Sequence, residues 1–278
     1  MSLGSSDGSD SALYASFINR ARELGTTVTP IDSAGDAQRQ SAQLAEIAQQ
    51  QPQAIAIQPL DAPATQATMQ RAAAAGVHVF GFGESLAYDE LEMLVYENTL
   101  AEGELSARYI GQKLGGHGTV ALVGSIKTPL AELRIEAASR VFRDELPNLT
   151  MLPREDVDVT SVLTTETKAG QRLGASLLAA HPDLAAAWCV NDAVAAGVGE
   201  AARTTGRSIV VTGIGGTEQG VSGVEGGQIT ATWDPRLDQV GANAAEDAIN
   251  ILQGRTPKWQ LPQRVTSDPV RRERASNA

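Results

Sequence analysis

Polar side chains that can hold a small molecule follow two of the apolar runs in this sequence. Asn191 and Asp192 come directly after Leu184–Val190, and Gln58 follows Ala54–Ile57. An amide both donates and accepts hydrogen bonds, whereas an ionised carboxylate only accepts them. Asn or Asp at such a place also serves as the N-cap of a following helix, which is worth on the order of 1 kcal/mol without any function. The residues leave both interpretations of the Asn191-Asp192 pair open.

The sequence favours no catalytic set. His78, His117 and His181 lie in separate segments without the spacing of metal ligands. Cys189 is the single cysteine, and its apolar neighbours predict a buried small hydrophobe rather than a reactive thiol. Ser222 lacks the second glycine of a nucleophile elbow. We therefore expect a protein that is not an enzyme and that carries no metal.

A glycine cluster resembles a cofactor motif only in part. Gly213 and Gly215 open like a dinucleotide fingerprint, but Glu218 stands in the third glycine position, where its charge would face a pyrophosphate. No loop of the form Gly-x-x-x-x-Gly-Lys-Ser/Thr is present either. The sequence therefore predicts no nucleotide cofactor.

Length and charge narrow the class of protein. The chain has 278 residues, of which 42% are hydrophobic and 20% charged, and at about 150 residues per domain this predicts two globular domains. Its 22 basic and 33 acidic residues give a net charge of −11. Phosphate backbones and anionic lipids repel such a protein. We therefore expect no nucleic-acid partner.

The elements that must position these residues alternate regularly along the chain. Short β-branched runs are followed by segments of helical length and periodicity, a pattern typical of parallel sheets covered by helices on both faces. The expected strands are Thr27–Ile31, Ala54–Gln58, Val77–Gly81, Thr119–Gly124, one within Leu149–Val162, Ala185–Val190, Ser208–Thr212 and Gln228–Thr232. After a first helix containing Leu13 to Leu24, the expected helices are Ala37–Gln51, Ala62–Ala75, Leu100–Leu114, Leu130–Leu146, Thr164–Ala180, Asp192–Thr205, Glu218–Glu225 and Arg236–Gln253.

One strand is absent from this pattern. The first helix should follow a strand, and the first strand of a doubly wound sheet is usually central. Only Met1–Gly4 and a polar segment precede that helix. We therefore expect the chain to be an incomplete record at this end, with a vacant strand position beside Val28–Ile31 and Ala54–Gln58.

Taken in order, several short motifs resemble the sugar-binding branch of the type I periplasmic binding proteins, the ribose-binding-protein family. The resemblance runs from Tyr14 to Val270, and the order and spacing of the motifs are more specific than any one of them. The motifs are Ala54–Asp61, Ala75–Val79, Gly103, Ala107–Gly116, Arg134, Ala180–Leu184, Asn191–Gly197, Gly213–Thr217 and Asp234-Pro235.

This resemblance implies an α/β fold of two doubly wound parallel-sheet lobes joined by a three-segment hinge. The first lobe is expected to contain residues 1–97 and 235–263, and the second residues 98–234 and 264–278. The hinge crossings are then near Asn98, near Trp233-Asp234 and near Arg264–Thr266. In the family, a ligand closes the cleft between the lobes and is thereby shielded from water.

Residue by residue, the resemblance gives Arg134 and Asn191 the role of donors to the ligand. Gln58 matches the position after the third strand, and Asp7 matches an Asn before the first helix. Asn98, at the first crossing, joins this expected set. If Arg134 faces the ligand, Arg134→Ala is expected to leave the melting temperature nearly unchanged and to lower affinity about ten- to a hundred-fold.

Two carboxylates of the family pattern are replaced in this chain by Gly83 and Gly215. Acceptors for ligand hydroxyls must then come from Glu84, Asp192, Asp234 or water. Trp233 stands where the family has a hinge Gln, and its ring is a candidate stacking face. Because the two glycines also enlarge the cleft, we expect a sugar, polyol or sugar acid other than plain ribose or glucose.

The resemblance further implies a monomeric substrate-binding component that delivers its ligand to a membrane ABC permease, without a cofactor. Such a protein is periplasmic or an extracytoplasmic lipoprotein, although Met1–Asp10 shows no leader. The effector domain of a lac-repressor-type regulator shares the fold and remains an alternative, as does a periplasmic sensor domain. Gly206–Ile209 lacks the Pro-x-Asp pattern common in those regulators.

Overall fold

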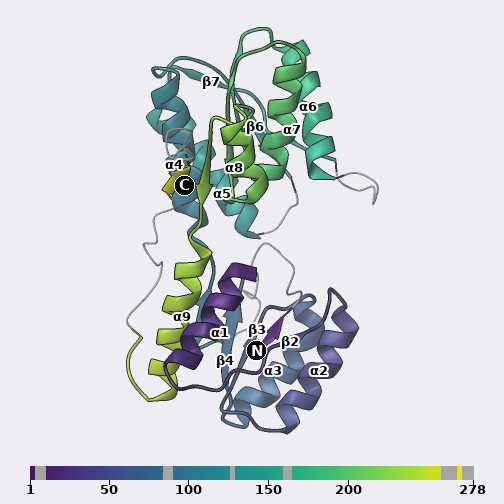
Figure 1. The fold of residues 1–278 in the computed structure, drawn as a ribbon, viewed down its shortest axis with the longest axis vertical. Helices are drawn as coiled ribbons and strands as arrows, with labels where there is room; N and C mark the ends of the chain where they lie inside the picture. The colour runs from purple at the N-terminus through teal and green to yellow at the C-terminus, as the bar shows by residue number, and fades with distance from the viewer. Residues whose placement is uncertain (4–10, 84–89, 126–128, 159–164, 258–267, 271–278) are drawn as a thin grey trace. The chain divides into compact units, whose positions relative to one another are not determined.

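The computed structural model of the protein describes residues 1–3, 11–83, 90–125, 129–158, 165–257 and 268–270 (Figure 1). The chain divides into two compact units. Unit 1 contains Met1–Glu97 and Arg236–Val265, and unit 2 contains Asn98–Pro235 and Thr266–Ala278. None of the helices in the described ranges is both long enough and apolar enough to span a lipid bilayer.

Unit 1 is built on a five-stranded parallel sheet in the order β2-β1-β3-β4-β5. Its strands are β1 (Ser2–Leu3), β2 (Ile31–Asp32), β3 (Ala54–Ile57), β4 (His78–Phe82) and β5 (Met93–Val95). Its helices are α1 (Ser11–Glu23), α2 (Ala37–Gln49), α3 (Ala62–Ala74) and α9 (Leu237–Leu252).

The alternation of side chains along the strands divides the core of unit 1 into two layers. Ile55 and Ile57 belong to one apolar cluster with residues of α2 and α3. Ala56, Phe80 and Phe82 belong to a second cluster with residues of α1 and α9. Helices therefore cover both faces of this sheet, as the sequence predicts.

The helices α1 and α9 pack closely although more than 200 residues separate them in sequence (Figure 1). Gly241 makes this approach possible, because a Cβ atom at that position would lie 2.2 Å from the carbonyl oxygen of Leu13. Any larger residue at position 241 would push the two helices apart.

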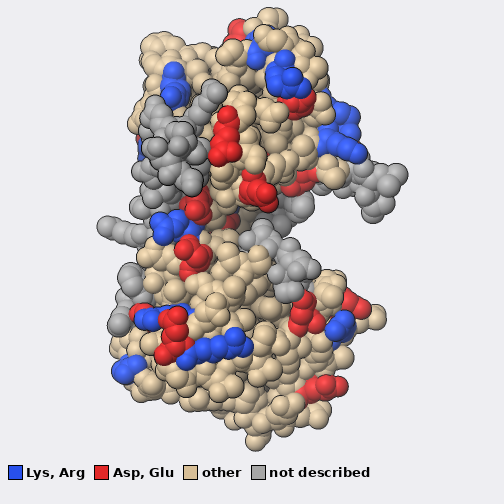
Figure 2. Space-filling view, in the orientation of Figure 1, with Lys and Arg blue, Asp and Glu red and all other residues tan. Residues whose placement is uncertain are grey.

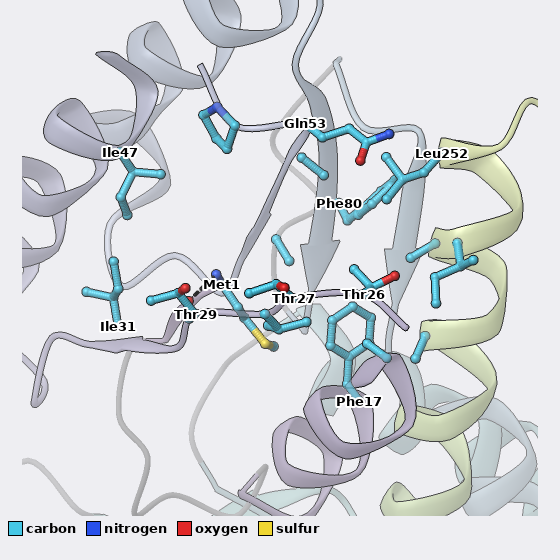
Figure 3. Close-up of a pocket in the computed structure, with 18 of the residues that line it drawn as sticks. Met1, Phe17, Thr26, Thr27, Thr29, Ile31, Ile47, Gln53, Phe80 and Leu252 are labelled. Atoms are coloured by element: carbon cyan, nitrogen blue, oxygen red, sulfur yellow. Dashed lines mark hydrogen bonds between the residues drawn. The ribbon is translucent and has the colours of Figure 1, made fainter. Parts of the chain in front are cut away.

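The prediction of a missing first strand is wrong in part. Ser2–Leu3 occupies the central position, where Ser2 is paired with both Ile31 and Ile57. The strand has only two residues, and a cavity of about 300 Å³ lies beside Thr26–Thr29 and Gln53–Ala56 (Figure 3). At its edge the terminal ammonium group of Met1 donates to the carbonyl oxygen of Thr29 at 2.8 Å. This cavity lies next to the amino end of β3.

Unit 2 is built on a seven-stranded sheet in which β12-β11-β10-β9-β6-β7 are successive neighbours and β8 also pairs with β6. The strands are β6 (Gly118–Gly124), β7 (Leu149–Met151), β8 (Glu155–Asp156), β9 (Leu184–Cys189), β10 (Val210–Ile214), β11 (Ala231–Asp234) and the antiparallel β12 (Asp268–Val270). The helices are α4 (Thr99–Lys113), α5 (Pro129–Arg140), α6 (Glu166–Ala180), α7 (Asp192–Thr204) and α8 (Glu218–Glu225), with a π-helical segment, Val141–Glu145, after α5.

Cys189 lies in the core of unit 2 with no exposed surface, which confirms the sequence-based expectation. Burial raises the pKa of its thiol well above the ordinary value. Because only the thiolate reacts rapidly, we expect Cys189 to resist a soluble disulfide reagent in the native protein and to react once unit 2 is unfolded in denaturant. Rapid stoichiometric labelling of the native protein would contradict this placement.

Candidate functional site

Polar residues gather where the parallel strands of unit 2 end. In open α/β sheets, ligands bind outside the carboxyl ends of the strands. Here Ser125 follows β6, Asn191 follows β9 and Gly215 follows β10, while Asp234 ends β11. We call this set of strand ends the carboxyl edge of unit 2.

Asn191 forms the N-cap of α7. Its side-chain oxygen accepts a hydrogen bond from the backbone N–H of Val194 at 2.9 Å, so the N-cap interpretation is confirmed. Its amide nitrogen donates to Oε2 of Glu166 at 3.0 Å, and Oε1 of Glu166 accepts from the hydroxyl of Ser125. Sequence reasoning missed Glu166, whose only signal was an acid directly after the N-cap residue Thr165. Contact of Asn191 with a ligand stays a prediction.

Asp192 points into the protein and does not supply a free acceptor. Its carboxylate accepts from the backbone N–H of Thr217 at 2.9 Å, from the Thr217 hydroxyl at 2.9 Å and from the Thr232 hydroxyl at 2.5 Å. The residue is 2% exposed, and burial is the largest effect on its pKa, which is raised. The expectation that Asp192 accepts from a ligand is therefore corrected. The Asp192 carboxylate instead links the loop that follows β10 to strand β11.

The glycine cluster makes room for this carboxylate. Cβ atoms at Gly213 and Gly220 would lie 2.4 and 2.2 Å from side-chain oxygens of Asp192. Gly215 has a φ of 139°, a backbone conformation that residues with a side chain rarely adopt. A residue with a side chain at position 215 would therefore need a different backbone conformation.

Arg134 is buried and points to the interior of unit 2. Its Nη2 lies 2.7 Å from Oε2 of Glu102 in α4, and its Nη1 donates to the carbonyl oxygen of Val190 at 3.0 Å. The side chains of Arg134 and Glu102 are 10% and 1% exposed. This contradicts the expectation that Arg134→Ala leaves stability unchanged, because the substitution would strand a buried carboxylate.

Trp233 is a core residue rather than a flat face at the surface. It is 2% exposed, and its ring meets that of Tyr109 edge to face with centroids 5.3 Å apart. The stacking role expected from the sequence is corrected accordingly. Asp234, the next residue, is half-buried at the end of β11.

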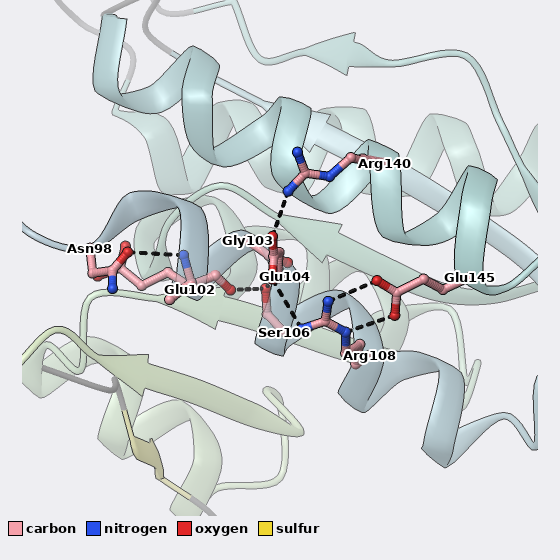
Figure 4. A network of polar contacts seen from close by, with 9 residues as sticks. Asn98, Glu102, Gly103, Glu104, Ser106, Arg108, Arg140 and Glu145 are labelled. Carbon is pink, nitrogen blue, oxygen red and sulfur yellow. Dashed lines mark hydrogen bonds and ion pairs between the residues drawn. The ribbon is translucent and has the colours of Figure 1, made fainter. Parts of the chain in front are cut away.

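Asn98 and Gln58 hold secondary structure in place. Asn98 caps α4 by accepting from the N–H of Ala101 at 3.2 Å (Figure 4). Gln58, in unit 1, donates its backbone N–H to Ser2, and its carbonyl oxygen accepts from Nε2 of Gln40 at 2.7 Å. The other two expected site residues, Asp7 and Glu84, lie outside the described residues.

Ion pairs fasten α4 to the helical segment that carries Arg134 (Figure 4). Arg108 bonds to Glu145 at 2.7 and 2.8 Å, and Arg140 bonds to Glu104 at 2.5 Å. The hydrogen bond with Glu145 is the main cause of the raised pKa of Arg108. These pairs keep the two helices aligned around the buried Glu102.

Within the described ranges, no three His, Cys, Asp or Glu side chains come together as a metal site. On the face shown in Figure 2, acidic and basic side chains are interspersed and no broad basic patch is visible. The cavity of unit 1 is lined by residues at the amino end of β3, so it lies away from the carboxyl ends of the strands where ligands are expected.

Comparison with known proteins agrees with this architecture. The family described as "Periplasmic binding protein domain" matches residues 5–256. The ribose import binding protein of Bacillus subtilis is 27% identical over 235 residues, which are 84% of this chain and 74% of the relative. A periplasmic ribose ABC transporter structure from Conexibacter woesei superposes with a TM-score of 0.85 at 21% identity, covering 99% of this chain and 92% of the other.

A solute-binding protein from Bacillus halodurans with bound myo-inositol has a TM-score of 0.78 at 17% identity and covers 99% of this chain and 94% of the other. At these identities the structural likeness establishes the fold, while the match over residues 5–256 establishes the family. Two α/β units with polar strand ends, and a family match across most of the sequence, lead to one conclusion: the chain belongs to the periplasmic binding protein family.

Proposed function

We propose that this chain is the solute-binding component of an ABC importer and captures a carbohydrate-like ligand at the carboxyl edge of unit 2. The observation that carries the proposal is the carboxyl edge of unit 2, where Ser125, Glu166 and Asn191 are hydrogen-bonded together. Hydroxyls, amides and carboxylates are the groups that recognise sugar hydroxyls. Relatives that import ribose, and one that holds myo-inositol, support this ligand class.

The family also supports an extracytoplasmic location, since its curated relatives include import binding proteins. We propose further that the protein is monomeric, delivers its ligand to a membrane permease and does not turn the ligand over. Anchoring as a lipoprotein is a further element of the proposal. Incubation with each ligand that binds, followed by analysis of the ligand, should return it unchanged.

A thermal-shift panel tests the ligand class. We expect at least one pentose, hexose or polyol to raise the melting temperature, because a ligand at 100 times its Kd stabilises the folded state by about 2.7 kcal/mol. Small-angle scattering with that ligand should show a smaller radius of gyration if closure accompanies binding. Stabilisation by amino acids alone would contradict the sugar-binding proposal, and an unchanged radius would contradict closure.

A further inference from the structure

Glu166 is a hydrogen-bond acceptor at the carboxyl edge of unit 2, although it is not among the site residues expected from the sequence. It is the first residue of α6, held there by the N-cap Thr165, whose hydroxyl accepts from the N–H of Lys168 at 3.3 Å. The side chain is half-buried and reaches Asn191 after β9 and Ser125 after β6. Its carboxylate therefore lies between two strand ends, while the carboxylate of Asp192 is turned inward.

The carboxylate of Glu166 has acceptor capacity left over. An ionised carboxylate offers about four lone-pair positions. Among the described residues, one hydrogen-bond donor reaches each oxygen: Ser125 reaches Oε1 and Asn191 reaches Oε2. Each oxygen can accept one more hydrogen bond, which matches two adjacent hydroxyl groups of one ligand.

The charge around this carboxylate disfavours a second anion. Of the described arginines near these strand ends, Arg134 is paired with Glu102, Arg154 with Glu132 and Asp156, and Arg236 with Asp238. The carboxylates of Glu166 and Asp192 come in addition to those pairs, and both accept hydrogen bonds from uncharged groups. A sugar acid would bring its own negative charge close to this acidic set, and like charges at such distances repel.

We propose that Glu166 accepts hydrogen bonds from ligand hydroxyls and makes the site selective for neutral polyhydroxylated ligands over sugar acids. This inference rests on the proposed function and narrows it. In the same arrangement Glu166 also orients the amide of Asn191, whose second N–H meets no acceptor among the described residues and can donate to a ligand oxygen.

Calorimetric titration of the whole chain tests the selectivity directly, with D-ribose, D-allose and myo-inositol as neutral probes and D-gluconate and D-galacturonate as anions. We expect wild type to bind at least one neutral probe and to bind both anions at least tenfold more weakly. Because loss of a hydrogen bond to a charged group is worth roughly ten- to a hundred-fold in affinity, Glu166→Gln should weaken the neutral probe by about tenfold or more. The same variant should also reduce the ratio between the affinity for the neutral probe and the affinity for the anions.

Glu225→Gln is the matched control, because it removes the same charge from an exposed position at the end of α8 and should leave both affinities unchanged. Melting of each ligand-free variant shows whether it is folded. If wild type binds no sugar or polyol, the proposed function fails and this inference fails with it. If wild type binds a neutral probe but Glu166→Gln binds it equally well, or if an anion binds wild type most tightly, only the inference is overturned.

Discussion

Replacing Glu102 with alanine is expected to lower the stability of unit 2 by about 3–5 kcal/mol. The substitution leaves the guanidinium of Arg134 buried without its carboxylate 2.7 Å away, and an unpaired buried charge carries a large desolvation cost. For a protein of this size the melting temperature should fall by roughly 6–20 °C, measurable by circular dichroism. Arg134→Ala should have a similar effect, because it leaves Glu102 unpaired instead.

Glu104→Ala is the control for this prediction. Glu104 lies on the same helix and pairs with Arg108 and Arg140, but these arginines are 40% and 51% exposed, so about 1 kcal/mol or less is expected. A double variant, Glu102→Leu with Arg134→Met, should regain most of the loss, because apolar pairs can replace buried ion pairs. Equal losses for Glu102→Ala and Glu104→Ala would contradict the buried-pair account.

Asp192→Ala is expected to lower the stability of unit 2 by about 1–3 kcal/mol. The buried Thr232 hydroxyl loses its acceptor, and a buried unsatisfied group costs about 1–3 kcal/mol, whereas the N–H and hydroxyl of the exposed Thr217 can bond to water instead. Chemical denaturation followed by tryptophan fluorescence measures this loss. Asp144→Ala, at an exposed site of the same unit, should change stability by less than about 0.5 kcal/mol. A comparable effect of the two substitutions would count against the bracing role of Asp192.

The raised pKa of Asp192 gives this residue a distinctive pH dependence. The folded state holds the Asp192 proton more tightly than the unfolded state does, so the contribution of this carboxyl to stability falls as pH rises through its folded pKa. The test compares the free energy of unfolding of wild type with that of Asp192→Asn, whose side chain cannot titrate. The difference, wild type minus variant, should be largest near pH 4 and should be smaller at pH 7. A difference that grows with pH would contradict the raised pKa.

The alternation of strands and helices was predictable because apolar runs and amphipathic segments differ in period. The exceptions are short. β5 (Met93–Val95) has three residues and follows a polar segment, and β12 (Asp268–Val270) contains a proline, so neither shows a strand pattern. Ser2–Leu3 shows no strand pattern either, since two residues carry no periodicity and only the neighbouring strands define their place.

The orientation of Arg134 could have been predicted from spacing. Arg134, Ala138 and Val141 recur at intervals of four and three, and all three are buried on one face. The role of Glu166 could not have been predicted in this way. It depends on contacts with Ser125 and Asn191, which lie 41 and 25 residues from Glu166 in the sequence and follow two different strands. Resemblance to a family identifies which residue types occupy a position, but it does not show where their side chains point.

The division of the chain also determines the order in which its parts can be completed during synthesis. The helix α1 buries its apolar face against α9, so unit 1 cannot close its core until residue 252 has been made. Most of unit 2 is encoded between these helices and, β12 apart, is complete by Pro235. As the chain emerges from the ribosome, unit 2 can therefore fold first. The strands and helices of unit 1 remain exposed until α9 has been synthesised.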